Sequence, residues 1–370
     1  MSMNTTSRLR VRAEWEPYDT VLIAWPHRDT DWAPMMNEIT ECYLNLARAI
    51  AVESRLRLLV VTPEPDHVGQ LLKDLPPERL IVFKCPTNDT WTRDYGPISA
   101  DIESPRSEAP DQDVAEGGSK ANERTAPAVL DFQFNGWGLK FAANLDNMVN
   151  LRMLHAKLLK AKYIPRLSFV FEGGSMEVDG EGTMLSTTDC LMSLNRNGIV
   201  TEDQLRRYFS EALGIHTLHL LHHGSLKGDD TDSHIDTLAR LAPGDTILYV
   251  KSYRPNDCHT VELEAMEQEL MSLRTRKGTP YNLIALPLPD PIHDSNGDRL
   301  PATYANFLIT PSTVLMPTYG QPNNDHMAHQ MLEIAFAGRR VIDVDCRPLI
   351  RQHGSLHCAT MQIPAGSLAI

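Results

Sequence analysis

The stretch Glu172-Gly173-Gly174-Ser175-Met176, continued after a polar turn by Gly182-Thr183-Met184-Leu185-Ser186, decides the fold of this 370-residue chain. A polar loop passes into a short hydrophobic strand, a glycine turn and a second strand. The same order recurs in Tyr304-Ala305-Asn306-Phe307-Leu308-Ile309, followed by Thr313-Val314-Leu315-Met316. Repetition of such units around an axis would give a propeller-like body whose loops meet at one end, and an open sheet is the alternative.

Short hydrophobic runs alternate along the rest of the chain with segments of helical periodicity, which indicates an α/β fold. The runs that we interpret as strands are 57–61, 80–83, 129–132, 168–171, 217–221, 246–250, 283–286, 307–310 and 314–316. Helical periodicity extends over 35–52, 148–160, 202–213, 260–273 and 326–337.

One segment, 101–127, is rich in Ser, Pro, Glu, Asp and Gly and has no apolar periodicity. We expect it to be an acidic, low-complexity surface loop. The residues on either side of it, ending at Ile98 and starting again at Val129, look like two strands that could pair. No comparable linker occurs elsewhere, so we expect one catalytic domain that spans residues 1–370.

The composition favours a cationic small molecule as partner. A formal net charge of −13 disfavours nucleic acid and anionic membrane surfaces. The six cysteines are dispersed without a CxxC pair, which is typical of reduced thiols in a cytoplasmic protein. No segment approaches the roughly 20 apolar residues that cross a bilayer. We therefore expect a cytoplasmic protein with no membrane or nucleic-acid partner, and the sequence leaves a homo-oligomer open.

Cys358 is the candidate nucleophile among these thiols. It follows a Gly354-Ser355 turn and His357, whereas Cys190 lies in an apolar run. A thiolate attacks electrophilic carbon well, and one such cysteine with histidine and acidic residues elsewhere in the chain is a recurrent nucleophilic arrangement. The alternative is that Cys358 fills the core, as most cysteines do.

The acidic stretch 228–237 contains His234-Ile235-Asp236. In extended backbone, a spacing of two residues would place the side chains of His234 and Asp236 on one face. Histidine can serve as acid and base in turn near neutral pH. The alternative is a solvated N-terminal cap of a helix over 237–241.

Two further acidic residues lie where predicted strands end. Asp94, within Trp91-Thr92-Arg93-Asp94, could bind a cation through paired hydrogen bonds, and Trp91 offers an apolar wall. A structural Arg93–Asp94 ion pair is the alternative. Glu172 directly follows an apolar run, and burying a carboxylate is costly unless it has a partner. It could orient His234 or bind a cation, or it could bond the amides of its own turn.

Five ordered motifs resemble those of agmatine deiminase and of the wider bacterial peptidylarginine-deiminase-type family, within the guanidine-modifying superfamily. The likeness extends over nearly the whole chain and implies the five-bladed, pseudo-symmetric α/β propeller of ββαβ units that this family has. The motifs are Trp91-Thr92-Arg93-Asp94-Tyr95-Gly96-Pro97, Phe134-Asn135-Gly136-Trp137-Gly138, Glu172-Gly173-Gly174-Ser175-Met176-Glu177-Val178-Asp179-Gly180-Glu181-Gly182-Thr183, Asp229-Asp230-Thr231-Asp232-Ser233-His234-Ile235-Asp236 and Leu356-His357-Cys358.

The resemblance implies that Cys358 is the nucleophile and that His234 is the general acid and base. Asp94 and Asp236 match the carboxylates that clamp a guanidinium group, and Glu172 matches the glutamate that supports the histidine. In the implied reaction the thiolate attacks the guanidinium carbon, ammonia leaves, and water hydrolyses the covalent thiouronium. No metal and no organic cofactor is needed.

Agmatine is the substrate that the resemblance favours, because Asp230 matches an acidic position near the far amine. Trp91 and Trp137 could wall the methylene chain. Gly354 belongs to the loop before the nucleophile, where Gln352-His353-Gly354-Ser355 replaces the usual glycine-rich sequence of the family. Because that loop shapes access, free or peptidyl arginine is an alternative substrate.

Three other classes stay open at this point. An amidinotransferase would use the same cysteine, and a non-enzymatic homologue would keep the fold but lose part of the set. A metal hydrolase based on His222, His223 and His234 is the third and poorest alternative.

Overall fold

The computed structural model describes residues 8–103 and 125–369, and its strands form five sheets. The first sheet has the order β1-β5-β6-β7 and the last the order β17-β2-β3-β4. The first comprises β1 (Arg8–Val11), β5 (Ile98–Glu103), β6 (Thr125–Gln133) and β7 (Lys162–Val170). The last comprises β17 (Met361–Pro364), β2 (Tyr18–Ala24), β3 (Arg57–Thr62) and β4 (Leu80–Lys84). In this last sheet the neighbours β2 and β17 come from opposite ends of the chain.

Three smaller sheets each contain three strands. One comprises β8 (Glu177–Val178), β9 (Thr183–Thr187) and β10 (Thr217–Leu221); the next comprises β11 (Ala239–Ala242), β12 (Thr246–Lys251) and β13 (Asn282–Pro287). The third comprises β14 (Leu308–Ile309), β15 (Thr313–Thr318) and β16 (Arg340–Asp345).

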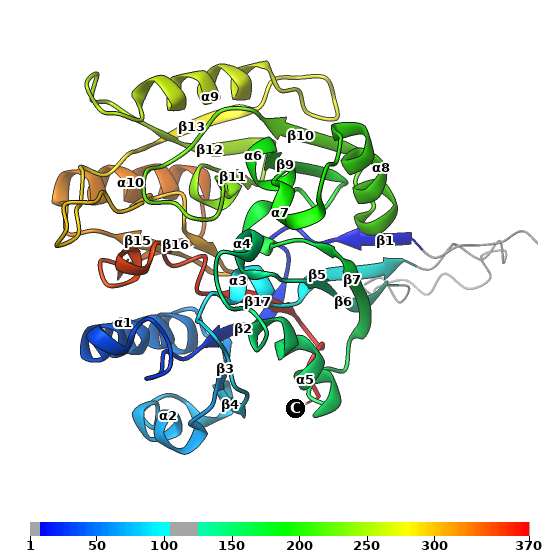
Figure 1. The fold of residues 1–370 in the computed structure, drawn as a ribbon, viewed down its shortest axis with the longest axis vertical. Helices are drawn as coiled ribbons and strands as arrows, with labels where there is room; N and C mark the ends of the chain where they lie inside the picture. Colours follow the sequence, from blue (N-terminus) through cyan, green and yellow to red (C-terminus); the bar gives the residue numbers. More distant parts are fainter. Residues whose placement is uncertain (1–7, 104–124, 370) are drawn as a thin grey trace, which may run out of the picture.

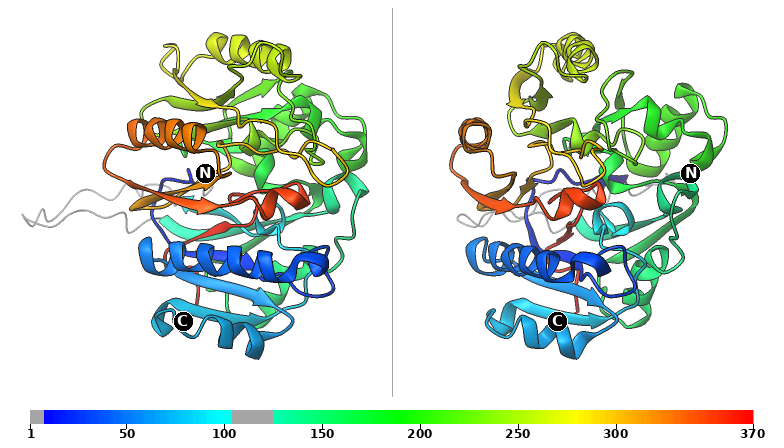
Figure 2. Two further views of the ribbon diagram at one scale, coloured as in Figure 1. Left: turned by 90° about the vertical axis from the view of Figure 1, so that its left-hand side faces the viewer. Right: turned by 60° about the vertical axis from the view of Figure 1, so that its left-hand side comes forward.

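All five sheets share one connection: two antiparallel strands, a helical segment, and a strand parallel to the second. A crossover helix is the usual link between parallel strands. The connecting helices are α1 (Met36–Arg48), α5 (Val149–His155), α8 (Glu202–Leu213), α9 (Thr260–Ser272) and α10 (Pro322–Ala335). Helices α1, α9 and α10 lie on the outside of the molecule, with the strands nearer its middle (Figures 1 and 2).

Local sequence explains where these elements begin and end. Helix α8 starts at a capping box in which Thr201 and Gln204 satisfy each other's free amides, and it ends at Gly214 in the left-handed conformation. Strand β3 lies between two parallel neighbours, and its side chains from Leu58 onward are buried on both faces.

Short helices and 3-10 turns connect the strands. They are α2 (Pro65–Leu71), α3 (Thr92–Tyr95), α4 (Gly136–Leu139), α6 (Thr188–Leu191), α7 (Leu194–Asn197) and the 3-10 turns η1 (Ala33–Met35), η3 (Pro77–Arg79), η4 (Asp146–Met148), η5 (Gly173–Ser175), η6 (Ile235–Thr237) and η7 (Leu349–Gln352). Among them, α3, α4, η5 and η6 overlap four of the five motifs. A π-helical segment, η2 (Ala49–Glu53), extends α1. Turn η5 contacts both α3 and η6, which brings three of the five motifs together.

The strand and helix expectations are largely confirmed. Each of the nine predicted strand runs overlaps an observed strand, and α8 has the predicted bounds. Strands β5 and β6 pair with Ile98 opposite Leu130, as expected. The predicted surface loop is wrong at both ends, because 101–103 and 125–127 belong to these two paired strands. Its middle, 104–124, lies outside the described residues. Within the described ranges, no helix has the length and apolar character needed to traverse a membrane.

Candidate active site

Cys358 lies between η7 and β17, and its side chain is buried. Asn306 fixes this segment, because its side-chain oxygen accepts the backbone N–H groups of His357 at 2.9 Å and of Cys358 at 3.2 Å. The Asn306 amide nitrogen lies 3.2 Å from the Cys358 Sγ atom. The Asp236 Oδ2 atom is 3.8 Å from the same sulfur. The thiol is therefore held between an amide and a carboxylate.

Asp94 comes from α3, and each of its oxygens accepts one hydrogen bond from a neutral donor. Its Oδ1 atom accepts the Gly174 N–H at 3.0 Å, and its Oδ2 atom accepts the indole N–H of Trp137 at 2.9 Å. Trp137 reaches it from a left-handed backbone (φ 54°), which is costly for a bulky residue. Arg93 points elsewhere, towards the His357 carbonyl and Glu14. The Arg93–Asp94 pair is therefore wrong.

His234 is fully buried between two carboxylates. Its Nε2 atom is 3.1 Å from Glu172 Oε2, and its Nδ1 atom is 3.6 Å from Asp94 Oδ1 without a hydrogen-bond partner. It is the residue before turn η6, which leads into β11, so the alternative of a helix over 237–241 is also wrong. The free Nδ1 atom faces the same space as Asp94.

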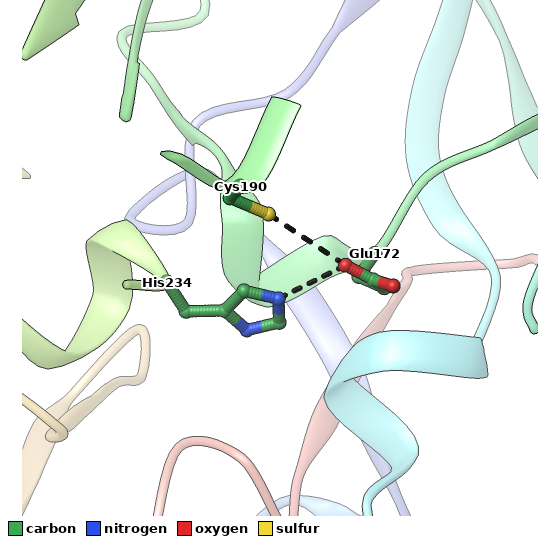
Figure 3. A group of neighbouring side chains, drawn as sticks. All are labelled: Glu172, Cys190 and His234. Carbon is green, nitrogen blue, oxygen red and sulfur yellow. Dashed lines mark hydrogen bonds and ion pairs between the residues drawn. The ribbon is translucent and has the colours of Figure 1, made fainter. Parts of the chain in front are cut away.

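Glu172 has partners on all sides. The Arg196 Nε atom lies 3.0 and 2.8 Å from its two oxygens, and the Cys190 sulfur is 3.7 Å from Oε2 (Figure 3). Glu172, Cys190 and His234 have ligand-type atoms within 4.8 Å of one another. The positive charge beside this triplet is that of Arg196, whose other nitrogens bind Asp232 and the Thr231 carbonyl.

Asp236 is anchored from behind by a chain of buried charges. His357 Nδ1 is 2.8 Å from Asp236 Oδ2, and His357 Nε2 is 2.6 Å from Glu14. Arg240 then binds Glu14 and Glu177 at 2.9 and 2.6 Å. The other oxygen of Asp236, Oδ1, is buried without a partner. Because an unpaired buried carboxylate oxygen is costly, it implies a missing donor.

Gly174 explains why the motif around Glu172 contains glycine. A Cβ atom built there would lie 2.6 Å from His234 Nδ1, 2.7 Å from Asp94 Oδ1 and 3.2 Å from Asp236 Oδ2. Three polar groups therefore converge on the space that only a glycine leaves empty.

Burial and neighbouring charges raise the pKa values of Asp94, Cys358 and His234. The pKa of Asp94 is raised to about 6, chiefly by burial and also by the nearby Asp236 and Glu172, while His234 opposes the shift. Burial also raises the pKa of the Cys358 thiol well above its usual value, together with Asp236 and Asp94. Burial alone would lower the pKa of His234, but Asp94, Cys190 and Glu172 raise it well above the ordinary range.

The other two carboxylates stay ionised. Burial alone would raise the pKa of Asp236 and of Glu172, but opposite charges outweigh it. The hydrogen bond and charge of His357 lower the pKa of Asp236, and those of His234 and Arg196 lower that of Glu172. Two buried carboxylates and a cationic histidine therefore surround a protonated thiol.

A pocket of about 150 Å³ opens beside the sulfur. Its lining comprises Asp31, Asp89, Trp91, Asp94, Trp137, Phe141, Asp229, Asp230, Thr231, Thr237, Gln352, His353, Gly354 and Cys358. Five aspartates and no lysine or arginine are among these described lining residues. His234, Asp236 and Glu172 lie behind this surface rather than in it. The pocket suits a cation with an apolar middle.

Trp91 packs flat against the loop that precedes the nucleophile. A Cβ atom at Gly354 would lie 2.3 Å from the Trp91 ring, so Gly354 is the residue that lets the indole form this wall. Trp32 supports the indole from the other side, with ring centroids 5.7 Å apart.

The residues of the acidic stretch have different partners. Asp229 accepts the backbone N–H groups of Thr231 and Ser233, which holds the turn. Asp232 is paired with Lys140 and Arg196 at 2.6 Å each. Asp229 and Asp230 both line the pocket, and neither has an ion-pair partner among the described residues. Because Asp229 holds the turn, Asp230 is the candidate for binding a cation.

The structure places all nine predicted site residues around one pocket or directly behind it. Sequence reasoning did not identify the residues that contact the Cys358 thiol, Glu172 and Asp236. These residues are Asn306, His357, Arg196 and Cys190. Asn306 was detectable, because it lies in the polar loop 304–306 that repeats the loop at Glu172. His222 and His223, by contrast, pair with Glu202 and Glu269 on the surface and lie apart from this pocket.

Comparisons with known proteins agree with this site. The profile of the Porphyromonas-type peptidyl-arginine deiminase family matches residues 10–364. An agmatine deiminase of Stutzerimonas stutzeri is 27% identical, with 95% of each chain covered.

Solved structures give the same result. An agmatine deiminase of C. jejuni, a cysteine-to-serine variant with substrate bound, has a TM-score of 0.83 at 32% identity, over 98% of each chain. A candidate arginine deiminase of Porphyromonas gingivalis has a TM-score of 0.85 at 44% identity, over 98% of this chain and 100% of that one.

The family and its agmatine deiminase relatives indicate a hydrolase that acts on C–N bonds in linear amidines. The chain belongs to the Porphyromonas-type peptidyl-arginine deiminase family.

Proposed function

We propose that the protein is an agmatine deiminase that hydrolyses agmatine to N-carbamoylputrescine and ammonia, with Cys358 as the nucleophile. The observation that carries this proposal is that Cys358 and Asp94 line one small acidic pocket, with Asp236 3.8 Å from the sulfur and His234 3.6 Å from Asp94. The reaction needs a thiolate, a proton donor and a pair of carboxylates that hold the guanidinium.

Asp94 and Asp236 bind the guanidinium in this proposal. The partnerless Oδ1 atom of Asp236 is a ready acceptor, and Asp94 lies across Gly174 from it. Paired charge-assisted hydrogen bonds fix the planar cation in register with the sulfur. The positive charge of the bound guanidinium offsets the negative charges of Asp94 and Asp236, which raise the pKa of Cys358. Substrate binding therefore favours the thiolate, and the thiol proton passes to solvent.

The first half-reaction forms a carbon–sulfur bond and breaks a carbon–nitrogen bond. The Cys358 thiolate adds to the guanidinium carbon. His234, which is cationic beside Asp94 and Glu172, gives its free Nδ1 proton to the departing nitrogen. Ammonia leaves, and an S-alkylthiouronium cation stays on Cys358.

The second half-reaction returns the enzyme to its starting state. His234, now neutral, takes a proton from water as the water oxygen adds to the thiouronium carbon. The carbon–sulfur bond breaks, the thiolate departs and a urea is released, while the proton left on the added oxygen passes through solvent to the sulfur. Glu172 and Arg196 keep the imidazole in place throughout, because Glu172 is fixed by both of its oxygens.

The preference for agmatine over arginine rests on the charge of the pocket. An α-carboxylate would need a cationic donor, and none of the described lining residues is a lysine or arginine. The far ammonium group of agmatine suits Asp230. The methylene chain between the two cations fits between Trp91 and Trp137. The name of the C. jejuni neighbour supports the same substrate.

Ammonia release from agmatine, free arginine and a peptidyl arginine tests this proposal. Agmatine should give the highest kcat/KM, and Cys358→Ala should release none. Release that needs an added amine acceptor would show an amidinotransferase instead. Asp230→Asn should raise the KM for agmatine more than it lowers kcat, and an unchanged KM would contradict the role of Asp230.

We further propose that the five sheets are the blades of a single pseudo-symmetric α/β propeller domain that acts in the cytoplasm. The shared strand connection and the pairing of β2 with β17, which joins the two ends of the chain, support the propeller. All six cysteines are free, which suits a reducing compartment.

A further inference from the structure

His353 has an unusual backbone and an anchored ring at the edge of the pocket. It lies in the left-handed conformation (φ 66°), which histidine tolerates better than most residues. Its Nδ1 atom is 2.7 Å from the Gly228 carbonyl oxygen. A carbonyl oxygen only accepts hydrogen bonds, so Nδ1 carries a hydrogen. When the ring is neutral, its lone pair is therefore on Nε2.

The anchor is a glycine that packs closely against a neighbouring segment. Gly228 has a φ of 87°, and a Cβ atom there would lie 2.4 Å from the Arg299 carbonyl. The ring of His353 is thus bonded to backbone while it lines the pocket that Asp230 also lines. The two side chains also interact, because a positive charge on His353 lowers the pKa of Asp230, which burial otherwise raises.

We propose that His353 is a specificity-determining residue that, with Asp230, receives the distal ammonium group of the substrate. This inference rests on the proposed deiminase function. The neutral ring accepts a hydrogen bond from the ammonium through Nε2. The protonated ring has no lone pair, repels the ammonium and occupies Asp230. His353 therefore favours dicationic guanidines when its ring is neutral.

Other charged groups around the proposed ammonium site determine how ammonium binding depends on pH. Asp31, Asp89 and Asp229 line the same pocket, and Lys140 binds the Asp230 carbonyl at 2.5 Å. Burial raises the pKa of Asp230, so a falling pH protonates Asp230 sooner than an exposed aspartate and weakens ammonium binding. Asp94 also takes up a proton, but it contacts the guanidinium and so affects every guanidine alike.

The test compares agmatine with butylguanidine, which lacks only the distal amine. His353→Asn keeps a residue that tolerates the left-handed conformation, and His222→Asn is the matched control at an exposed histidine. His353→Asn should raise the KM for agmatine about tenfold, as expected for losing a hydrogen bond to a charged group, and leave that for butylguanidine within about twofold. His222→Asn should change neither.

The ratio of kcat/KM for agmatine to that for butylguanidine is a second measurement, because it isolates the contribution of the distal ammonium group. It should fall about tenfold from the wild-type enzyme to His353→Asn and stay unchanged in His222→Asn. An equal loss on both substrates in His353→Asn, or an unchanged ratio, would overturn the role of His353. A wild-type enzyme that released ammonia from neither probe would contradict the deiminase function and this inference with it.

Discussion

Replacement of Gly174 by alanine tests the geometry of the site without touching a reacting group. The added Cβ would lie 2.6 Å from His234 Nδ1 and 2.7 Å from Asp94 Oδ1, about 0.8 and 0.7 Å inside an ordinary contact of 3.4 Å. Both neighbours are buried and bonded, so the histidine, the carboxylate or the turn must shift by a comparable distance. A displacement near 1 Å costs on the order of 100-fold in rate.

We therefore expect Gly174→Ala to lower kcat for agmatine by about 100-fold while the protein stays folded. Overpacking of this kind costs about 1–3 kcal/mol of stability, which a large domain tolerates. Ammonia release and thermal unfolding followed by circular dichroism measure the two effects separately.

Gly69→Ala is the matched control, because Gly69 lies in helix α2 and a Cβ there meets nothing within 4 Å. It should keep full activity and stability. Wild-type kcat and KM in Gly174→Ala would refute the claim that His234 and Asp94 converge on this position.

Three further predictions follow from the buried charges. Because the pKa of Asp94 is raised to about 6 and its ionised form binds the substrate, kcat/KM should fall on the acid side of about pH 6. A profile flat down to pH 5 would exclude Asp94 as a binding carboxylate. Alkylation of Cys358 by neutral iodoacetamide should accelerate with pH up to and beyond pH 9, because burial, Asp236 and Asp94 raise its pKa. A cationic haloacetamidine should react faster at pH 7, and equal rates would contradict activation by a bound cation. Arg196→Met should lower the free energy of unfolding in urea by about 3–5 kcal/mol, since it removes the cation from a buried ion pair. Arg206→Met, at an exposed ion pair, should lower it by less than about 1 kcal/mol. If Arg196→Met lost no more free energy of unfolding than Arg206→Met, the stability of buried Glu172 would not depend on Arg196.

Periodicity located most strands and helices, because burial on one or both faces produces a regular pattern of apolar residues. Strands β2, β11 and β16 escaped notice, and so did β1 and β17, which are four residues long and whose partners are distant in the chain. The spacing of His234 and Asp236 suggested extended backbone, but His234 directly precedes a 3-10 turn and Asp236 lies within it. A separation of two residues does not distinguish these conformations.

The candidate reactive residues were easier to predict from the sequence than the residues that hold them in place. Cys358, Asp94 and Glu172 stood out because of their local sequence context, a glycine turn or a position near the end of an apolar run. Arg196 lies in Asn195-Arg196-Asn197, where nothing distinguishes it from a surface arginine until the fold brings Glu172 to it. The catalytic roles of Cys358, Asp94 and Glu172 stay predictions.

Mass spectrometry of the enzyme during turnover tests the covalent chemistry at Cys358 most directly. The protein is mixed with agmatine, quenched in acid within the first turnovers, digested and analysed at the peptide that contains Cys358. We predict an adduct on Cys358 with the mass of agmatine less one ammonia, which disappears once the substrate is consumed. Steady ammonia release with an unmodified Cys358 peptide, or with the Cys358→Ala protein, would contradict the account.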